Sequence, residues 1–405
     1  MNLLFVHQNA PAQFRHVMAA LAAEGTHKIV CVSTRPGLRL PGVGCINYPA
    51  PPPSDGPIAL RPMAAAFAHG QSVAAICEGL QRNGFTPDLV IGHPGWGETL
   101  FIKDVFPQTA LLHYCEFFYQ AVGADIGFDP AQPVDLALRQ AVRMRNAPSL
   151  LALAAGDHGI APTEWQRSLH PAAFLSGISV AHDGIDTDRI TPDPAARFTL
   201  PDRRSLAPGA PIVTYVARGL EPQRGFPSFM RAVPAIQRAR PDADILVVGG
   251  DAPRYGPSPP GGGTWRDRML DEIRDQPGFN PAQLHFLGIL PFDRYVAMLQ
   301  VSAVHVYLTV PFVLSWSMLE AMAAGCLVVG SATPPVAEVI TDGVNGLLVP
   351  FFAPDAIAAR ALEGLAAGPA LAGIRRGARQ TVLDHYRLVD CVARQRAIMD
   401  MCLDA

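Results

Sequence analysis

Residues 303–346 read as two successive strand–loop–helix units, and this stretch constrains the fold more than any other part of the chain. The apolar run 303–309 predicts a strand, and residues 317–324 are rich in Leu, Met and Ala, which are good helix formers. Gly325 follows, as glycine commonly does just past the last turn of a helix. A second strand over 327–330 leads into another helix. This alternation predicts an α/β fold whose parallel strands are covered by helices.

Both loops of this stretch are expected at the carboxyl ends of neighbouring strands, where open α/β sheets bind ligands. Each loop leads into a helix N-terminus, whose backbone N–H groups carry partial positive charge and suit a phosphate group. Glu320 lies on the first turns of the first helix. From spacing alone, it is either a solvated side chain or a contact for a ligand.

The motif LEAMAAG, followed by PVAEVI and DGVNGLLV, strongly resembles the donor-site signature of family 4 glycosyltransferases, which have the GT-B fold. The N-terminal stretch FVHQNAPAQFRH resembles a subgroup of that family that carries FVHQN-x-P-x-QFRH. The resemblance implies two Rossmann-like domains facing across a cleft, with a C-terminal helix that crosses back to the first domain. We place the acceptor-side domain at 1–189, the nucleotide-sugar domain at 190–385 and the returning helix at 386–405.

Two arginines flank a loop between a strand and a helix in the second half, and a planar guanidinium suits a diphosphate. The alternative is a pair of surface arginines. The resemblance assigns both to the leaving diphosphate, and it assigns Glu320 to the ribose hydroxyls. The implied donor-binding residues are Arg218, Arg224, Gly225, Gly288, Ile289, Leu314, Ser315, Trp316, Ser317 and Glu320.

The family has a further glutamate before Glu320, at the position that Phe312 occupies here. The acid that faces the donor sugar in the family is therefore missing. This departure keeps two alternatives open. One is a non-catalytic GT-B subunit or scaffold of a glycosylation complex, and the other is a nucleotide-sugar epimerase.

Polar residues gather after the first strands of the chain, which suggests the wall of a site as well as ordinary loop and capping roles. Trp96 is either a platform for a sugar or a core residue, and Glu98 is either structural at a helix start or part of the site. His113 and Glu116 follow one strand, so the carboxylate is expected to hold the imidazole in one tautomer unless His113 is a core histidine. The acceptor-side candidates are Gln8, Asn9, Gln13, Trp96, Glu98 and Glu116.

Composition narrows the class of protein. The chain has 405 residues, enough for two domains, and a net charge of −3 that does not suggest nucleic acid. Its seven scattered cysteines include no Cys-x-x-Cys pair, which favours a reducing compartment and argues against a zinc site. No Gly-x-Gly-x-x-Gly follows the first strand, so a nicotinamide dinucleotide is not expected there. The opening MNLLFVHQN reads as a strand rather than a signal peptide.

We therefore expect a retaining, metal-independent hexosyltransferase of glycan biosynthesis that works in the cytoplasm. His113, Arg218 and Arg224 are its expected catalytic residues. It needs no cofactor beyond the donor, for which a UDP-sugar is the first expectation and GDP- and dTDP-sugars are the alternatives. The acceptor is a glycan, lipid, protein or small molecule. No membrane span is expected, while peripheral membrane contact and the oligomeric state stay open.

Overall fold

The computed structural model describes residues 1–366 and 368–404 of the chain. Ala367 and Ala405, the last residue of the expected returning helix, lie outside this part. The chain forms two compact units. The N-terminal unit comprises Met1–Gly184 and Leu388–Ala405, and the C-terminal unit comprises Ile185–Arg387.

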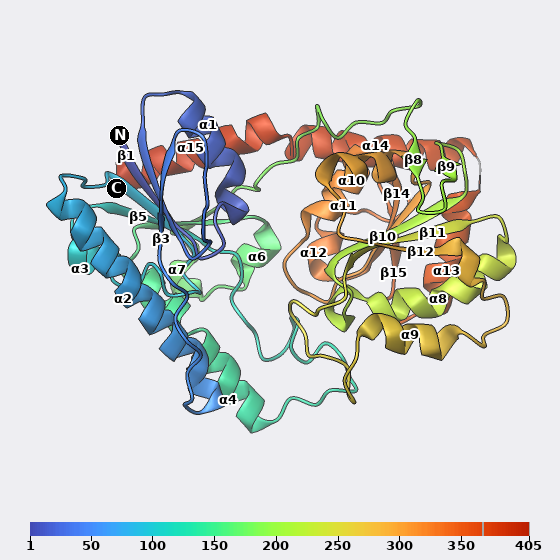
Figure 1. The fold of residues 1–405 in the computed structure, drawn as a ribbon, viewed down its shortest axis with the longest axis horizontal. Helices are drawn as coiled ribbons and strands as arrows, with labels where there is room; N and C mark the ends of the chain where they lie inside the picture. Colours follow the sequence, from blue (N-terminus) through green and yellow to red (C-terminus); the bar gives the residue numbers. More distant parts are fainter. Residues whose placement is uncertain (367, 405) are drawn as a thin grey trace. The chain divides into compact units, whose positions relative to one another are not determined.

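The N-terminal unit is built on a seven-stranded parallel sheet with the strand order β3-β2-β1-β4-β5-β6-β7 (Figure 1). The strands are β1 (Asn2–Val6), β2 (Lys28–Ser33), β3 (Val43–Asn47), β4 (Leu89–Gly92), β5 (Ala110–Tyr114), β6 (His158–Ala161) and β7 (Ile178–Val180). The helices are η1 (Ala12–Phe14), α1 (Arg15–Ala23), η2 (Ile58–Leu60), α2 (Arg61–Arg82), α3 (Ile102–Val105), α4 (Leu136–Arg145), α5 (Ala147–Ala155), α6 (Glu164–Ser168), α7 (Ala172–Leu175) and α15 (Leu388–Leu403).

The apolar run of β1 explains how this sheet is covered, because successive side chains of a strand point to opposite faces. Leu3 and Phe5 belong to a buried cluster with residues of α1 and α15. Leu4 and Val6 belong to a second cluster with residues of α2 and α3. Helices on both faces bury the central strands β1 and β4, which is the usual environment of parallel strands, while the edge strand β3 stays partly exposed.

The last helix, α15, belongs to the N-terminal unit although it is last in the chain. It contacts α1, β5 and β6, and its Ile398, Met399 and Cys402 are buried in the cluster of the first sheet face. The predicted return of the C-terminal helix to the first domain is therefore confirmed.

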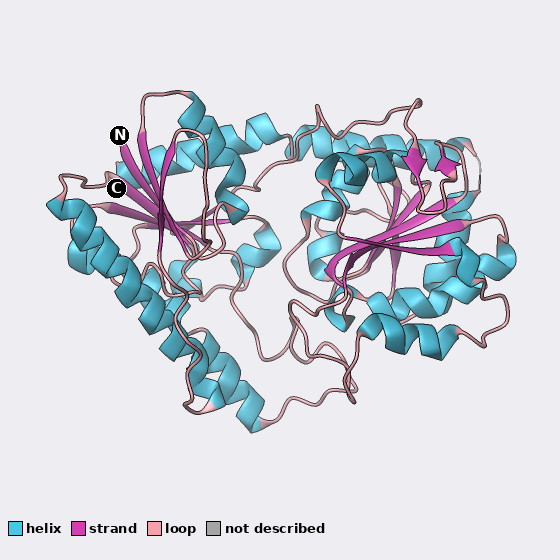
Figure 2. Cartoon of the chain, viewed as in Figure 1, coloured by secondary structure: helices cyan, strands magenta, loops and turns pink. Residues whose placement is uncertain are grey.

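The C-terminal unit has a six-stranded parallel sheet with the order β12-β11-β10-β13-β14-β15, shown with its helices in Figure 2. Its strands are β10 (Ile212–Gly219), β11 (Asp244–Gly250), β12 (Leu284–Gly288), β13 (Val304–Tyr307), β14 (Leu327–Ser331) and β15 (Leu347–Val349), besides the small antiparallel pair β8 (Phe198–Thr199) and β9 (Ser205–Leu206). Its helices are η3 (Pro222–Arg224), α8 (Phe226–Ala239), α9 (Trp265–Ile273), η4 (Pro281–Gln283), α10 (Phe292–Val301), α11 (Trp316–Ala323), α12 (Pro334–Ala337), α13 (Pro354–Leu365) and α14 (Pro369–His385).

Both sheets reverse their strand order next to their first strand. The reversal lies between β1 and β4 in the N-terminal unit and between β10 and β13 in the C-terminal unit. Ligands of open α/β sheets bind at the carboxyl ends of the strands beside such a point. The loops after these four strands are therefore where a site is expected in each unit.

The expected element pattern around 303–346 is confirmed to within a few residues by β13, α11 and β14, although the helix after β14 is the single turn α12. The unit boundaries fall after Gly184 and after Arg387, against the expected 189 and 385. The residues between 185 and 190 join the C-terminal unit because Ile185 N donates to Tyr386 O at 2.8 Å and because Ile185 and Ile190 are buried in that unit's core.

Replacing one buried methionine of α15 tests its packing. We expect Met399→Ala to lower the free energy of unfolding by about 2–4 kcal/mol, because a buried Met→Ala change removes apolar contacts and leaves a cavity. Met401→Ala is the matched control, since Met401 is 45% exposed on the same helix while Met399 is 4% exposed. Equal effects of the two variants in chemical denaturation would contradict this packing of α15.

Candidate functional site

Five polar side chains gather at the carboxyl ends of β1, β4 and β5 in the N-terminal unit, and we call them the N-terminal polar cluster: His7, Gln13, His93, Glu98 and Glu116. The rings of His7 and His93 lie 6.1 Å apart in a T-shaped arrangement. Gln13 Nε2 donates to Glu116 Oε1 at 2.7 Å, and His93 Nε2 lies 3.3 Å from Glu116 Oε2. The structure thus brings Gln13, Glu98 and Glu116 together as expected acceptor-side residues, beside Gln8, whose backbone N–H donates to Glu98 Oε1 at 2.8 Å.

Backbone contacts orient both histidines of this cluster. Asn9 N donates to His7 Nδ1 at 2.9 Å, and Gly95 N donates to His93 Nδ1 at 3.0 Å. In each neutral ring the proton must therefore sit on Nε2. His93 Nε2 faces Glu116, whereas His7 Nε2 is buried without a hydrogen-bond partner. A buried donor of this kind marks a point where a ligand or a water can bind.

The two carboxylates of the cluster differ in charge state. Burial raises the pKa of Glu98 to about 7, although the backbone N–H groups and His93 act against it. Burial also acts to raise the pKa of Glu116, but the hydrogen bonds from His93 and Gln13 outweigh it and hold that pKa below its usual value. Environments that separate the pKa values of neighbouring acids are typical of functional sites. Burial lowers the pKa of His7 to about 3, so His7 is neutral at physiological pH.

Local backbone geometry places the loop after β4. Gly97 has a φ of +99°, and a Cβ there would overlap the backbone of Ala66 in α2, so only glycine fits this close approach. Trp96 is 38% exposed and stands 5.4 Å from the His93 ring. Asn9, the remaining acceptor-side candidate, is exposed at the rim of the first loop. Trp96 therefore offers an accessible aromatic face next to the polar cluster, as a platform for a sugar requires.

The structure places His113 away from this cluster. His113 is fully buried, its Nε2 donates to Ala152 O in α5 at 2.8 Å, and burial lowers its pKa to about 4. The expected pair of His113 with Glu116 is not formed. The reason is strand parity: Tyr114 packs on Phe14 at one sheet face, so His113, one residue earlier, points to the opposite face. His7 and His93 lie beside Glu116 instead. The polar first loop that carries His7 is interpreted from the sequence as the wall of a site, whereas His93 is not singled out, although its position directly after a buried strand was an available signal.

In the C-terminal unit, Arg224 is a buried cation at the carboxyl end of β13. It is 6% exposed, and its Nη1 donates to Thr309 Oγ1 at 2.8 Å, to Val313 O at 3.0 Å and to the Tyr307 hydroxyl at 3.5 Å. These three bonds use only Nη1, so the remaining donors of the guanidinium fork are not engaged by these partners. Arg224 is therefore not the surface arginine that the sequence left open.

Arg218 and Gly225 complete the loop around Arg224. Arg218 is exposed at the end of β10. Gly225 has a φ of +66° and a Cβ there would overlap Leu308, so it turns the chain from η3 into the N-terminus of α8. A 14-residue helix N-terminus thus begins directly after the buried cation. Both features favour an anion at this point of the sheet.

The remaining donor-binding candidates lie on or near α10 and α11. Ser315 N donates to the Tyr307 hydroxyl at 2.8 Å, which links the start of α11 to the surroundings of Arg224, and Ser315 Oγ lies 3.1 Å from Ser317 Oγ. Glu320 Oε2 accepts from the Tyr295 hydroxyl at 2.7 Å.

The other four donor-binding candidates differ in solvent exposure: Gly288, Ile289, Leu314 and Trp316. Leu314 is 4% exposed and Trp316 is partly buried against the same core, whereas Ile289, after Gly288, is 73% exposed.

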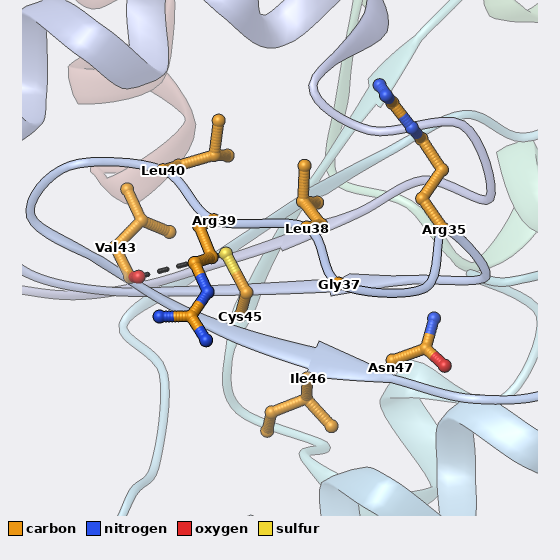
Figure 3. Close-up of a pocket in the computed structure, with 9 residues that line it drawn as sticks. All are labelled: Arg35, Gly37, Leu38, Arg39, Leu40, Val43, Cys45, Ile46 and Asn47. Carbon is orange, nitrogen blue, oxygen red and sulfur yellow. Dashed lines mark hydrogen bonds between the residues drawn. The ribbon is translucent and has the colours of Figure 1, made fainter.

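An open hollow of about 510 Å³ lies at the β2–β3 connection of the N-terminal unit (Figure 3). It is lined by Arg35, Gly37, Leu38, Arg39, Leu40, Val43, Cys45, Ile46 and Asn47. The guanidinium groups of Arg35 and Arg39 point in different directions in Figure 3, and Arg35 Nη1 donates to Ala10 O at 3.0 Å. The hollow therefore does not concentrate charge toward one ligand.

Among residues 1–366 and 368–404, no group of three or more His, Cys, Asp and Glu side chains is arranged to hold a metal ion. In the same residues, no single helix combines the length and the apolar composition needed to cross a membrane. The seven cysteines form no disulfide with one another in the described part of the chain, and all except Cys45 are buried.

Comparison with known proteins identifies both halves of the chain. Residues 25–190 match the model of the glycosyl transferase family 4 group, and residues 210–367 match that of glycosyl transferases group 1. Both models describe glycosyltransferase groups, so these matches support the GT4/GT-B family expected from the donor-site motif. The subgroup signature at the N-terminus stays a prediction.

Curated relatives and solved structures agree with these matches. The chain is 36% identical over 90 residues to a GDP-mannose-dependent alpha-(1-6)-phosphatidylinositol monomannoside mannosyltransferase of Mycolicibacterium smegmatis, covering 22% of this chain and 23% of that protein. It is 32% identical over 210 residues to a phosphatidyl-myo-inositol mannosyltransferase of Mycobacterium tuberculosis, covering 51% and 49%. The chain thus spans about half or less of these relatives. A glycosyltransferase structure from Rickettsia africae superposes with a TM-score of 0.71 at 17% identity, covering 99% of this chain and 98% of that one. Together with the two parallel sheets, this likeness confirms the GT-B fold.

The pKa of Glu98 predicts a change of stability with pH. In the folded chain its pKa is about 7, against 4.5 for an unperturbed carboxyl. Between these values the unfolded chain loses the proton and the folded chain keeps it, so the free energy of unfolding falls as the pH rises through this window. The total loss is on the order of 3 kcal/mol, because each pKa unit corresponds to about 1.4 kcal/mol.

We expect Glu98→Gln to remove this contribution, so that its stability relative to wild type rises steadily between the two pKa values. Denaturation at a series of pH values measures the difference. Glu78→Gln is the control, because Glu78 is exposed and pairs with Arg82 at 3.8 Å on the surface of α2. A difference between Glu98→Gln and wild type that does not vary with pH would exclude a raised pKa.

Proposed function

We propose that this glycosyltransferase, whose two family domains cover residues 25–190 and 210–367, transfers a sugar from a nucleoside-diphosphate sugar to a hydroxyl group. The donor binds to the C-terminal unit, and the acceptor binds mainly to the N-terminal unit. The transfer retains the anomeric configuration and needs no metal ion.

The buried guanidinium of Arg224 is the single observation that carries the donor assignment. A cation with 6% exposure, held by Thr309 and Val313 and followed at once by the N-terminus of α8, supports binding of a diphosphate. Arg218 adds an exposed cation at the end of the neighbouring β10. Glu320 on α11, oriented by Tyr295, offers a carboxylate to the ribose hydroxyls.

The same groups would stabilise the leaving diphosphate as the bond between C1 of the sugar and the phosphate oxygen breaks. The acceptor oxygen forms its bond to C1 on the same face, and its proton passes to the departing phosphate. Donors that are already aligned with a developing anion each contribute roughly 3–4 kcal/mol to transition-state stabilisation. Arg218, Arg224 and the helix N-termini would thereby do the work of a metal ion.

The N-terminal polar cluster supports acceptor binding through hydroxyl groups. Below a pH of about 7 the protonated Glu98 can donate a hydrogen bond, while the charged Glu116 accepts. His7 Nε2 adds a buried donor, and Trp96 adds an exposed aromatic face against which a sugar or polyol ring packs. The chemistry favours a neutral, hydroxyl-rich acceptor group.

The names of the relatives suggest which compounds to compare first. One mycobacterial relative is named as GDP-mannose-dependent, so GDP-sugars stand beside the UDP- and dTDP-sugars expected from the sequence. Both relatives are named for phosphatidylinositol acceptors, which makes an inositol-bearing lipid the first acceptor to offer. We also propose a reducing, cytoplasmic setting, which seven cysteines without a disulfide among the described residues support.

Incubation of the protein with each nucleotide sugar and acceptor separates the candidate functions. Transfer of the sugar with release of a nucleoside diphosphate supports the proposal. An isomerised donor without release would assign an epimerase instead. Binding without either product would assign a non-catalytic subunit, which Phe312 in place of the family's glutamate would then explain.

We expect Arg218→Ala to weaken binding of UDP or GDP by about 10- to 100-fold, since hydrogen bonds to charged groups contribute roughly 1.5–3 kcal/mol. Calorimetric titration measures the effect. The loss should disappear with uridine or guanosine, which lack phosphates. Arg274→Ala is the control, because Arg274 is an exposed arginine that pairs with Asp271 on α9. Equal losses for nucleoside and diphosphate would remove Arg218 from the phosphate site.

Glu320→Gln tests the ribose contact separately. Glutamine keeps an acceptor for the Tyr295 hydroxyl but lacks the charge, so we expect about tenfold weaker binding of the ribonucleotide. A 2′,3′-dideoxynucleotide should bind wild type and variant equally. Glu363→Gln, which alters an exposed ion pair with Arg360 on α13, is the matched control. A loss that persists with the dideoxynucleotide would show that Glu320 acts elsewhere.

A further inference from the structure

The connection between β11 and α9 is a Gly- and Pro-rich loop, residues 251–264, that is mostly exposed. One segment of it is nevertheless fixed. The backbone N–H groups of Arg254, Tyr255 and Gly256 all donate to one oxygen, Glu221 Oε2, at 3.0, 3.0 and 2.9 Å. Glu221 itself is fully buried in the loop after β10. The sequence analysis did not select Glu221 or Tyr255.

A buried carboxylate is unfavourable unless hydrogen bonds compensate for its lost hydration. Three successive N–H groups that converge on one oxygen form a concave site for an anion, and such charge-assisted bonds are stronger than neutral ones. Glu221 Oε1 is buried and makes no hydrogen bond, so the contact with residues 254–256 is what keeps this carboxylate inside. The loop and the carboxylate therefore stabilise each other.

Residues 252–256 also pack closely against the loop after β10. A Cβ on Gly219 would lie 2.7 Å from Ala252 O and 3.1 Å from Arg254 Cγ, and a Cβ on Gly256 would overlap Gln223 Oε1. Leu220 N also donates to Gly250 O at 2.9 Å. Segment 252–256 is thus seated directly on the loop that carries Glu221 and Arg224.

The fixed segment places the Tyr255 ring against Arg224. The Tyr255 ring centre lies 5.2 Å from the Arg224 guanidinium and 5.2 Å from the Phe312 ring, and the Phe312 ring centre lies 5.6 Å from the same guanidinium. Tyr255 is 44% exposed, so its backbone anchor and its contacts with Arg224 and Phe312 are what hold the ring in place. Two aromatic faces thereby fix the direction of the cation.

We propose that Glu221 is a positioning residue: it holds Arg254–Gly256 so that Tyr255, with Phe312, keeps the Arg224 guanidinium aligned for the phosphates of the nucleotide sugar. This inference rests on the proposed function for its ligand. The anchoring of the loop can be measured without any ligand. Glu221 touches neither the sugar nor the phosphates in this scheme, and acts through the loop.

Limited trypsin digestion tests the anchor. Arg254 is exposed, so its peptide bond to Tyr255 is cleaved when the segment leaves Glu221. We expect Glu221→Ala to speed cleavage after Arg254 by roughly tenfold or more without nucleotide, given the strength of charge-assisted bonds. Glu221→Gln, which keeps one carbonyl acceptor, should restore part of the protection. Glu272→Ala is the control. It removes an exposed residue of α9 that pairs with Arg231 of α8, and it should leave cleavage unchanged. Unchanged cleavage in Glu221→Ala would overturn the anchor.

Calorimetric titration with UDP and GDP tests the link to the phosphates. We expect about tenfold weaker binding for Glu221→Ala and for Tyr255→Ala, and no change with the matching nucleoside. Tyr255→Ala removes only the ring, because the contacts of Glu221 are made by backbone atoms. This variant therefore tests the role of the ring even if Glu221→Ala folds poorly. Normal diphosphate binding by both variants would overturn the inference and leave the proposed function standing. A wild-type protein that binds no nucleotide would overturn the proposed function and, with it, the role of the anchor in binding.

Discussion

The burial of the Arg224 guanidinium is the constraint on which the loops at the carboxyl end of the second sheet depend. An arginine cannot lose its charge in a protein, so its burial requires partners on every side. Thr309, Val313 and Tyr307 supply oxygen atoms, and Tyr255 and Phe312 supply aromatic faces. These residues come from β13 and from the loops around it and after β11. The strand order therefore determines whether the cation can be held at all.

In the N-terminal unit, two carboxyl groups rather than a buried cation lie at the carboxyl end of the sheet. Glu98 and Glu116 are neighbours with opposite pKa shifts, because one is buried beside few compensating donors and the other receives bonds from His93 and Gln13. A neutral donor next to a charged acceptor is suited to hydroxyl groups, which need both. A pair of identical side chain types thus acquires two roles from its surroundings.

Many of the strands could be predicted from the pattern of apolar residues in the sequence. The strands β1, β10 and β13 are rich in apolar residues, and β13–α11–β14 follows the expected order. The edge strand β3 and the first part of α2 were not expected, since they lie in a Pro-rich stretch and β3 alternates between partly buried and exposed residues. An edge strand gains its identity from pairing with β2, which no local pattern reports.

Local periodicity and glycine stereochemistry were enough to predict the α/β class, the loops at the strand ends and the turn at Gly225 before α8. Which polar side chains face those loops depended on the tertiary packing. His113 points into the core because side chains alternate between the two faces of a strand. Arg224 is buried by residues of neighbouring loops, and Glu221 is held by the backbone of residues 254–256. Side-chain direction and burial depend on neighbours far apart in the chain, and that information is absent from any short stretch of sequence.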